Sequence, residues 1–198
     1  RSSAASDVYK RQAEAGTGGT AASLGGGGGV TATATPTGQV AGGAGNIVTA
    51  TGNAVSDTGT AVGNLSLPIV PQQTQTDLGN VVTEGGGIVS TLGNGISSGL
   101  GQMGVIDNPV GVTVGSTGAV VNQTGVTVQS AGTLVSNLGT GQLAALAPVT
   151  APVGGLVTKV GETVSNASAP LTQVLTTGPV EQVTKTLSRT IVPLTSQV

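Results

Sequence analysis

Glycine recurs at every seventh residue through most of this 198-residue chain. In the clearest block, Gly111, Gly118, Gly125 and Gly132 each open a seven-residue unit, and a valine follows each glycine three residues later. The same frame recurs elsewhere, at Gly45, Gly52, Gly59, Gly79, Gly86, Gly154 and Gly161. Because a fixed repeat must match the period of a secondary structure, this spacing restricts the possible folds.

Seven residues span nearly two turns of an α-helix, so the glycine and the valine of each unit lie on one face, as positions a and d of a heptad. In a β-strand, an odd repeat would place successive valines on opposite faces. The spacing therefore predicts helices in which glycine lets a neighbouring backbone approach closely. It also predicts one buried stripe of valines, with Asn122 facing water; the stripe comprises Val114, Val121, Val128 and Val135.

Prolines separate the candidate helices, because proline removes a backbone donor and clashes with the preceding turn. We expect helices at about 45–66, 74–100, 111–146 and 153–168, and shorter pieces after Pro170, Pro179 and Pro193. Short connections favour antiparallel neighbours. The predicted fold class is mainly α, with antiparallel Gly/Val-heptad helices and a disordered Gly-rich N-terminal segment.

Two alternatives to the helical fold stay open. Val112 and Val114, like Val126 and Val128, alternate as in a strand, and glycine could turn the chain at each seventh residue in a β-solenoid. A largely disordered chain is the other alternative, because glycine and β-branched residues weaken isolated helices. Such helices would persist only when packed against each other or against further copies.

The chain divides into three segments by composition. Residues 1–12 resemble a translated sequencing adaptor and contain the only tyrosine and half of the basic residues. Residues 13–44 include a run of five glycines, which favours a flexible tether. Residues 45–198 form the heptad-repeat region, which we expect to be truncated at its C-terminus.

Composition excludes several classes of function. The chain has no cysteine and no histidine, its net charge is -2, and charged residues make up 7% of it. Nucleic-acid binding requires clustered cations and usually aromatic rings, and outside residues 1–12 the chain has neither. The acidic residues are scattered singly, so we expect no metal, no cofactor and no small-molecule substrate.

One catalytic motif occurs, at Gly95–Gly99, where G-x-S-x-G matches the nucleophile elbow of hydrolases around Ser97. A serine nucleophile needs a base, and the sequence offers neither a histidine nor an S-x-x-K lysine. We therefore predict that the protein is not an enzyme and has no catalytic, cofactor-binding or metal-binding residues.

Several segments resemble a known family when taken in order. They are GGIVSTLGNGISSGLG from Gly86, AGTLVSNLGTGQLAALAPVTAPVGGLVTKVGETVSNA from Ala131, and TTGPVEQVTKTLSRTIVPL from Thr176. Together they resemble β-proteobacterial proteins described as collagen-like triple helix repeat-containing. The resemblance implies a cell-surface or extracellular location, as an outer-membrane lipoprotein tethered through a lipidated N-terminus that is missing here. A collagen triple helix needs glycine at every third residue, which this chain does not have.

The resulting hypothesis is a non-catalytic structural protein of the cell surface or extracellular matrix, self-associating through Gly/Val faces. One alternative is an adhesin that presents its Thr/Ser/Asn-rich surface to a ligand. Carbohydrate adhesion usually uses aromatic platforms, which are lacking, so the sequence favours the structural role. A poorly folded low-complexity fragment is the third possibility.

Overall fold

The structure is a computed structural model that describes residues 33–65, 68 and 70–195. The helices are α2 (Pro36–Gly63), α3 (Gln72–Ser98), α4 (Pro109–Leu138), α5 (Ala147–Thr176) and α6 (Gly178–Thr195), with the short 3-10 helices η1 (Leu100–Gln102) and η2 (Gly141–Leu146). Within the described ranges there is no strand. The mainly α prediction is confirmed, and the β-solenoid alternative is wrong for this part of the chain.

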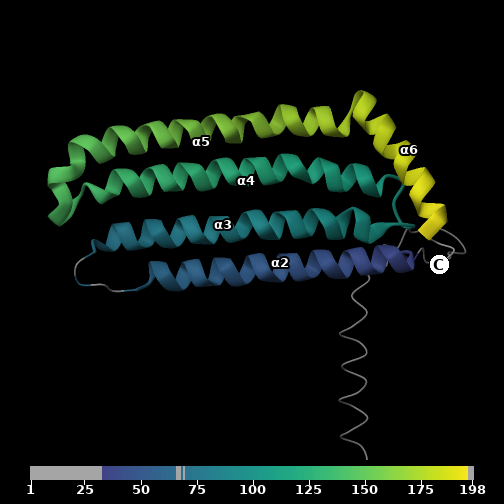
Figure 1. The fold of residues 1–198 in the computed structure, drawn as a ribbon, viewed down its shortest axis with the longest axis horizontal. Helices are drawn as coiled ribbons and strands as arrows, with labels where there is room; N and C mark the ends of the chain where they lie inside the picture. Colours follow the sequence, from purple (N-terminus) through teal and green to yellow (C-terminus); the bar gives the residue numbers. More distant parts are fainter. Residues whose placement is uncertain (1–32, 66–67, 69, 196–198) are drawn as a thin grey trace, which may run out of the picture.

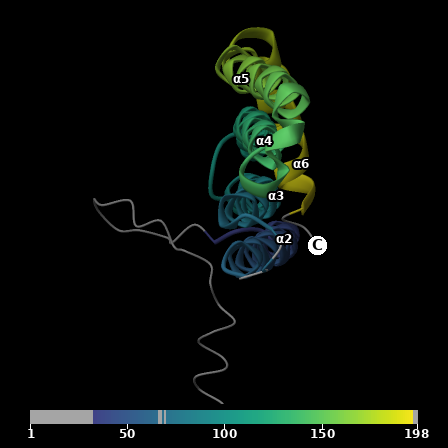
Figure 2. The same ribbon diagram turned by 90° about the vertical axis from the view of Figure 1, so that its left-hand side faces the viewer.

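The four long helices form a single layer. Helices α2, α3, α4 and α5 lie side by side in chain order and alternate in direction (Figure 1). Seen at right angles they make one column, one helix thick, and α6 crosses one end of it (Figure 2). Tertiary contacts are accordingly concentrated between neighbours in the chain. Each long helix therefore leaves two of its sides outside the layer.

The repeat glycines occupy position a of each heptad and line two glycine seams, α2–α3 and α4–α5. In the first seam the facing pairs are Gly45 with Gly93, Gly52 with Gly86, and Gly59 with Gly79; in the second they are Gly125 with Gly161 and Gly132 with Gly154. A Cβ added to Gly52 would lie 2.6 Å from Gly86 O, closer than real Cβ atoms come to other atoms. The backbones are therefore in direct contact, as the sequence predicted.

Small polar side chains four residues after the glycines join the helices of each seam. Ser56 Oγ donates to Thr83 O at 2.8 Å, and Thr83 Oγ1 donates to Ser56 O at 3.2 Å. In the second seam, Asn122 Nδ2 donates to Ser165 Oγ at 2.9 Å. These short side chains fit where the backbones nearly touch, and they hydrogen-bond groups that the close approach removes from water.

The central seam, α3–α4, has a different chemistry. Asp77 is only 4% exposed, and its Oδ2 accepts from Asn137 Nδ2 at 2.6 Å. One heptad further along, Glu84 Oε1 accepts from Ser130 Oγ at 2.8 Å. All four residues occupy position f of their heptads, five residues after a position a. The central seam therefore uses the helix sides opposite the glycines, which is what allows the layer to continue beyond one hairpin.

The layer consists of two similar hairpins. When Pro36 is aligned with Pro109, the repeat glycines of α2 coincide with those of α4. When Gly79 is aligned with Gly154, the repeat glycines of α3 coincide with positions a of α5, although Ser168 stands where the third glycine would be. The first helix of each hairpin is also capped in the same way. Thr35 Oγ1 accepts from Gly38 N at 3.1 Å, and Asn108 Oδ1 accepts from Gly111 N at 2.9 Å. The α2–α3 hairpin is thus repeated as α4–α5.

Helix α6 is held to the end of the layer by a small cluster of polar groups that includes the buried Ser188 and Thr184. Ser188 is completely buried, and its Oγ donates to Asn108 Oδ1 at 3.0 Å while accepting from Val110 N at 3.3 Å. Asn108 Nδ2 donates to Thr184 Oγ1 at 3.1 Å. A single asparagine therefore both caps α4 and docks α6.

Several predicted helix boundaries need correction. Helix α2 begins at Pro36 rather than near residue 45, so the last part of the expected 13–44 tether is helical. The rest of that tether, and residues 1–12, lie outside the described residues, apart from 33–35. Proline at the first turn lacks only a donor that would have no partner there, so Pro36 starts the helix.

Prolines in the C-terminal part also interrupt the chain less than predicted. Helix α5 starts at Ala147 with Pro148 in its first turn, and it continues through Pro152 and Pro170 to Thr176. Pro193 lies inside α6. Packing of α5 along α4 keeps the helix continuous where proline removes a backbone hydrogen bond.

The predicted buried valine stripe is wrong. The buried residues of α4 are Pro109 and its repeat glycines, whereas Val114, Val121, Val128 and Val135 are only half-buried. Because the glycine seam brings the backbones into contact, no space remains in it for a larger side chain. Asn122 is exposed as expected, but its side-chain amide also donates a hydrogen bond to Ser165 of α5.

Candidate interaction surfaces

Ser97 lies in the last turn of α3 and not at a strand-to-helix turn. Its Oγ is 3.1 Å from Gly93 O in its own helix and 3.1 Å from Asn46 Oδ1 of α2. The hydroxyl therefore belongs to the polar contacts of the α2–α3 seam. The absence of catalytic residues remains a prediction.

The acidic residues do not converge. In the described part of the chain, no group of three or more His, Cys, Asp or Glu side chains could hold a metal ion. Asp77 and Glu84 bond neutral partners in the central seam, and Glu181 pairs with Lys185 of its own helix at 2.6 Å. Structural contacts therefore account for Asp77 and Glu181, whereas Glu84 Oε2 is buried and has no hydrogen-bond partner among the described residues.

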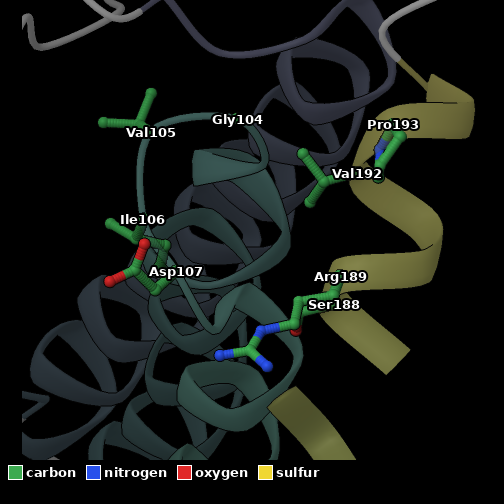
Figure 3. Close-up of a pocket in the computed structure, with 8 residues that line it drawn as sticks. All are labelled: Gly104, Val105, Ile106, Asp107, Ser188, Arg189, Val192 and Pro193. Carbon is green, nitrogen blue, oxygen red and sulfur yellow. The ribbon is translucent and has the colours of Figure 1, made fainter. Parts of the chain in front are cut away.

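An open hollow of about 320 Å³ lies between α6 and the loop before α4 (Figure 3). Its lining residues are Gly104, Val105, Ile106, Asp107, Ser188, Arg189, Val192 and Pro193. Figure 3 shows the Arg189 side chain extending from α6 toward the loop that carries Asp107. The only hydroxyl group among these lining residues, that of Ser188, donates a hydrogen bond to Asn108 Oδ1. The hollow is the junction of α6 with the layer and offers no nucleophile paired with a base.

One side of the layer carries small and polar residues. A shallow hollow of about 380 Å³ there runs across α3, α4 and α5, and it is lined by Thr91, Gly115, Gly118, Ala119, Asn122, Gln123, Ser168 and Thr172. The amides of this side also bridge helices, since Asn94 and Asn46 lie 3.2 and 3.1 Å from hydroxyls across the α2–α3 seam. We call it the polar face.

The opposite side carries positions d and g of the heptads, and we call it the valine face. It includes Val55 and Val62 of α2, Val82 and Val89 of α3, Val121 and Val128 of α4, and Val157 and Val160 of α5. Positions d and g of these four helices contain no charged residue. A broad apolar side is therefore left uncovered by the described chain.

In the part of the chain that the structure describes, the two outer helices also leave one edge each without a neighbour. The outer edge of α2 comprises positions c and f, which are Val40, Gly43, Ile47, Ala50, Ala54, Asp57 and Ala61; that of α5 comprises Val149, Pro152, Leu156, Lys159, Thr163, Asn166 and Pro170. All of these residues are exposed, and among the large hydrophobic ones the exposed fractions reach 74% for Val40 and 70% for Ile47. In α3 and α4 the same positions form the central seam.

By length and composition alone, one described stretch could cross a membrane. Leu143–Thr176 has a mean hydropathy of 1.5 over its most apolar window. A single helix of this kind is weak evidence for a span, because other helices satisfy the same criterion. In this structure its glycines pack against α4, and it carries Lys159 and Glu162 at mid-length.

Sequence reasoning did not identify the outer edges or the duplicated hairpin. The duplication was visible in the alignment of Pro36 with Pro109 and of Asn64-Leu65 with Asn137-Leu138. The edges could not be found without the order of helices in the layer, because positions c and f are covered in α3 and α4 but not in α2 and α5.

Comparison with known families supports the resemblance noted in the sequence. The family model described as the middle region of bacterial collagen matches residues 67–198, well over half of the chain. Curated proteins and solved structures give no match. The matched region contains α3 to α6, so the part of the chain that matches this collagen family consists of packed α-helices. The chain belongs to the bacterial collagen family defined by this middle region.

Proposed function

We propose that the protein is a non-catalytic structural component of the bacterial cell surface or extracellular matrix, and that it associates with further copies of itself. One observation carries the proposal: among the residues described, Met103 is the only buried hydrophobic residue. Large aliphatic side chains remain exposed instead, as at Ile47, Val149 and Leu156, with exposed fractions of 70%, 66% and 65%. Extended apolar surface on a folded protein is typical of an interaction site.

Association has to use surfaces other than the glycines. The repeat glycines are already in contact with each other inside the chain, so a second copy cannot reach them without opening a hairpin. The valine face and the two outer edges are available. The expected self-association through Gly/Val faces is accordingly restricted to the apolar surface outside the seams.

Composition and family support the absence of catalysis and the surface location. The chain has no histidine or cysteine to act as base or thiolate. Membership of the bacterial collagen family points to a structural role. The family resemblance also supports a tether to the envelope through a lipidated N-terminus.

The adhesin alternative receives less support. Amides on the polar face are engaged across the seams, as Asn122 is with Ser165 and Asn46 is with Ser97. The described residues contain no aromatic ring that could stack on a sugar. The polar side chains are therefore accounted for by the cohesion of the layer.

Sedimentation velocity of the full chain, recorded over a wide range of concentrations with parallel circular dichroism, tests the proposal. We expect an α-helical spectrum and a weight-average sedimentation coefficient that rises with concentration. A chain that stays monomeric at the highest attainable concentration, with its helicity intact, would contradict the self-associating role.

A further inference from the structure

Within the described residues, the layer ends on both sides without a further helix or loop to cover it. Arrays of repeated units normally need terminal units with polar outer faces to stay soluble as monomers. Here the outer edge of α2 presents Val40 and Ile47, and the outer edge of α5 presents Val149 and Leu156, all with exposed fractions between 65% and 74%. Both edges consist of the same heptad positions that α3 and α4 use to contact each other.

The duplicated hairpin fixes how these edges would meet. Helix α2 corresponds to α4, and α5 corresponds to α3, so α5 of one copy can contact α2 of the next as α3 contacts α4. The directions agree, because α5 is antiparallel to α2 in the layer just as α3 is antiparallel to α4 (Figure 1). Continuing the layer in this way keeps the order of the helices and the alternation of their directions.

Charge supports this register. In the alignment of the hairpins, Lys159 occupies the place of Glu84, and Asp57 occupies the place of Ser130. Glu84 and Ser130 are hydrogen-bonded across the central seam at 2.8 Å. Lys159 of one copy would therefore meet Asp57 of the next. Lys159 is the only basic residue in the four long helices, and Asp57 is the only acidic residue in α2.

Side-chain size is consistent with the same register. A Cβ added to Gly95 of α3 would collide with Ser116 of α4, so the central seam has its glycine on α3 at this point. The corresponding residues at the outer edges are Pro170 of α5 and Gly43 of α2. At the outer edges the larger residue is on α5 and the glycine is on α2. The proposed contact would therefore still pair one bulky residue with one small residue at this position.

We propose that the outer edge of α5 binds the outer edge of α2 of a second copy of this chain, with Lys159 opposite Asp57. This inference rests on the proposed self-association and names its interface. Because the two edges are different surfaces, the contact is head-to-tail and leaves a free edge at each end. The product is an open filament in which the helical layer continues from copy to copy.

The test uses charge reversal in the full chain. Asp57→Lys places two lysines at the contact, and Lys159→Glu places two carboxylates there. At low ionic strength we expect each variant to need roughly tenfold more protein for half-maximal association, because an attraction is replaced by a repulsion. An equimolar mixture of the two variants should recover wild-type association, since every contact in an alternating filament then pairs opposite charges. The double variant should recover it as well.

Matched controls place charges on the two inner helices, α3 and α4, away from both outer edges. Asn80→Lys on α3 and Thr133→Glu on α4 alter exposed positions of helices that have neighbours on both sides, so wild-type association is expected. Circular dichroism of each variant establishes that the helices are intact. Electron microscopy of the wild type and of the mixture should show filaments of variable length.

Other outcomes would overturn the edge contact. If the protein associates but the mixture is no better than either variant alone, the edges are not the interface and self-association still stands. Loss of association in Val121→Asp, with charge reversal ineffective, would assign the contact to the valine face. A plateau at the dimer excludes an open filament. A monomer that instead binds phosphatidylcholine vesicles would refute both the edge contact and the self-association.

Discussion

Adjacent glycines in α3 offer a direct test of the glycine seams. A Cβ at Gly86 would collide with Gly52 O and would lie 2.6 Å from Ser56 N, whereas a Cβ at Gly85 has no atom within 4 Å. In a helix interior, replacing glycine by alanine normally stabilises by about 0.8–1 kcal/mol. Overpacking costs about 1–3 kcal/mol, and the upper end applies to Gly86 because the obstructing atoms belong to the backbone.

Gly86→Ala should therefore destabilise the protein by about 2 kcal/mol, and Gly85→Ala should stabilise it by about 0.5–1 kcal/mol. For a chain of this size, the melting temperature should fall by roughly 4–8 °C in the first variant and rise by about 1–4 °C in the second. Thermal and urea unfolding, followed by circular dichroism under monomeric conditions, measures both. Equal stability of the two variants would refute the close backbone contact.

Three further outcomes are expected. Asn108→Ala should lower the free energy of unfolding by about 1–3 kcal/mol and accelerate amide hydrogen exchange in α6. The reason is that the variant loses the cap of α4 and leaves the buried Ser188 hydroxyl without its acceptor. The control Asn53→Ala, at an exposed site, should change neither the stability nor the exchange rate. Val121→Asp should lower the free energy of unfolding by only about 1 kcal/mol in urea titrations, since the half-buried side chain can reach water; a loss of several kcal/mol would restore the buried-stripe model. A fluorophosphonate probe should leave Ser97 unlabelled, and stoichiometric labelling would refute the non-catalytic assignment.

The heptad spacing predicted the helices and their glycine contacts, because both depend on local geometry. A glycine at every seventh residue lies on one helix face whatever the neighbour is, so the direct contact of Gly52 with Gly86 follows from the pattern. The same reasoning placed Val121 in the seam. It failed there because glycine at position a lets the backbones meet, and position d is then pushed to the side of the layer.

Global arrangement was not accessible from the pattern. Positions c and f are covered in α3 and exposed in α2, although the two helices have the same repeat. Only the order of the helices decides which of these positions meets a neighbour. For the same reason the sequence could identify Asp57 and Lys159 only as solitary charges, and not as residues at the two ends of one layer.

The scarcity of buried aliphatic side chains also has a thermodynamic consequence. Exposure of apolar surface on unfolding raises the heat capacity, whereas exposure of polar surface lowers it. In this layer the seams bury mainly backbone, glycine and small hydroxyl groups, and Met103 is the only buried hydrophobic residue in the described ranges. The heat-capacity increment of unfolding, per residue, should therefore lie below the usual value of about 12–15 cal/mol/K. The stability of the monomer would then vary unusually little with temperature, and cooling would weaken it less than a protein with an aliphatic core.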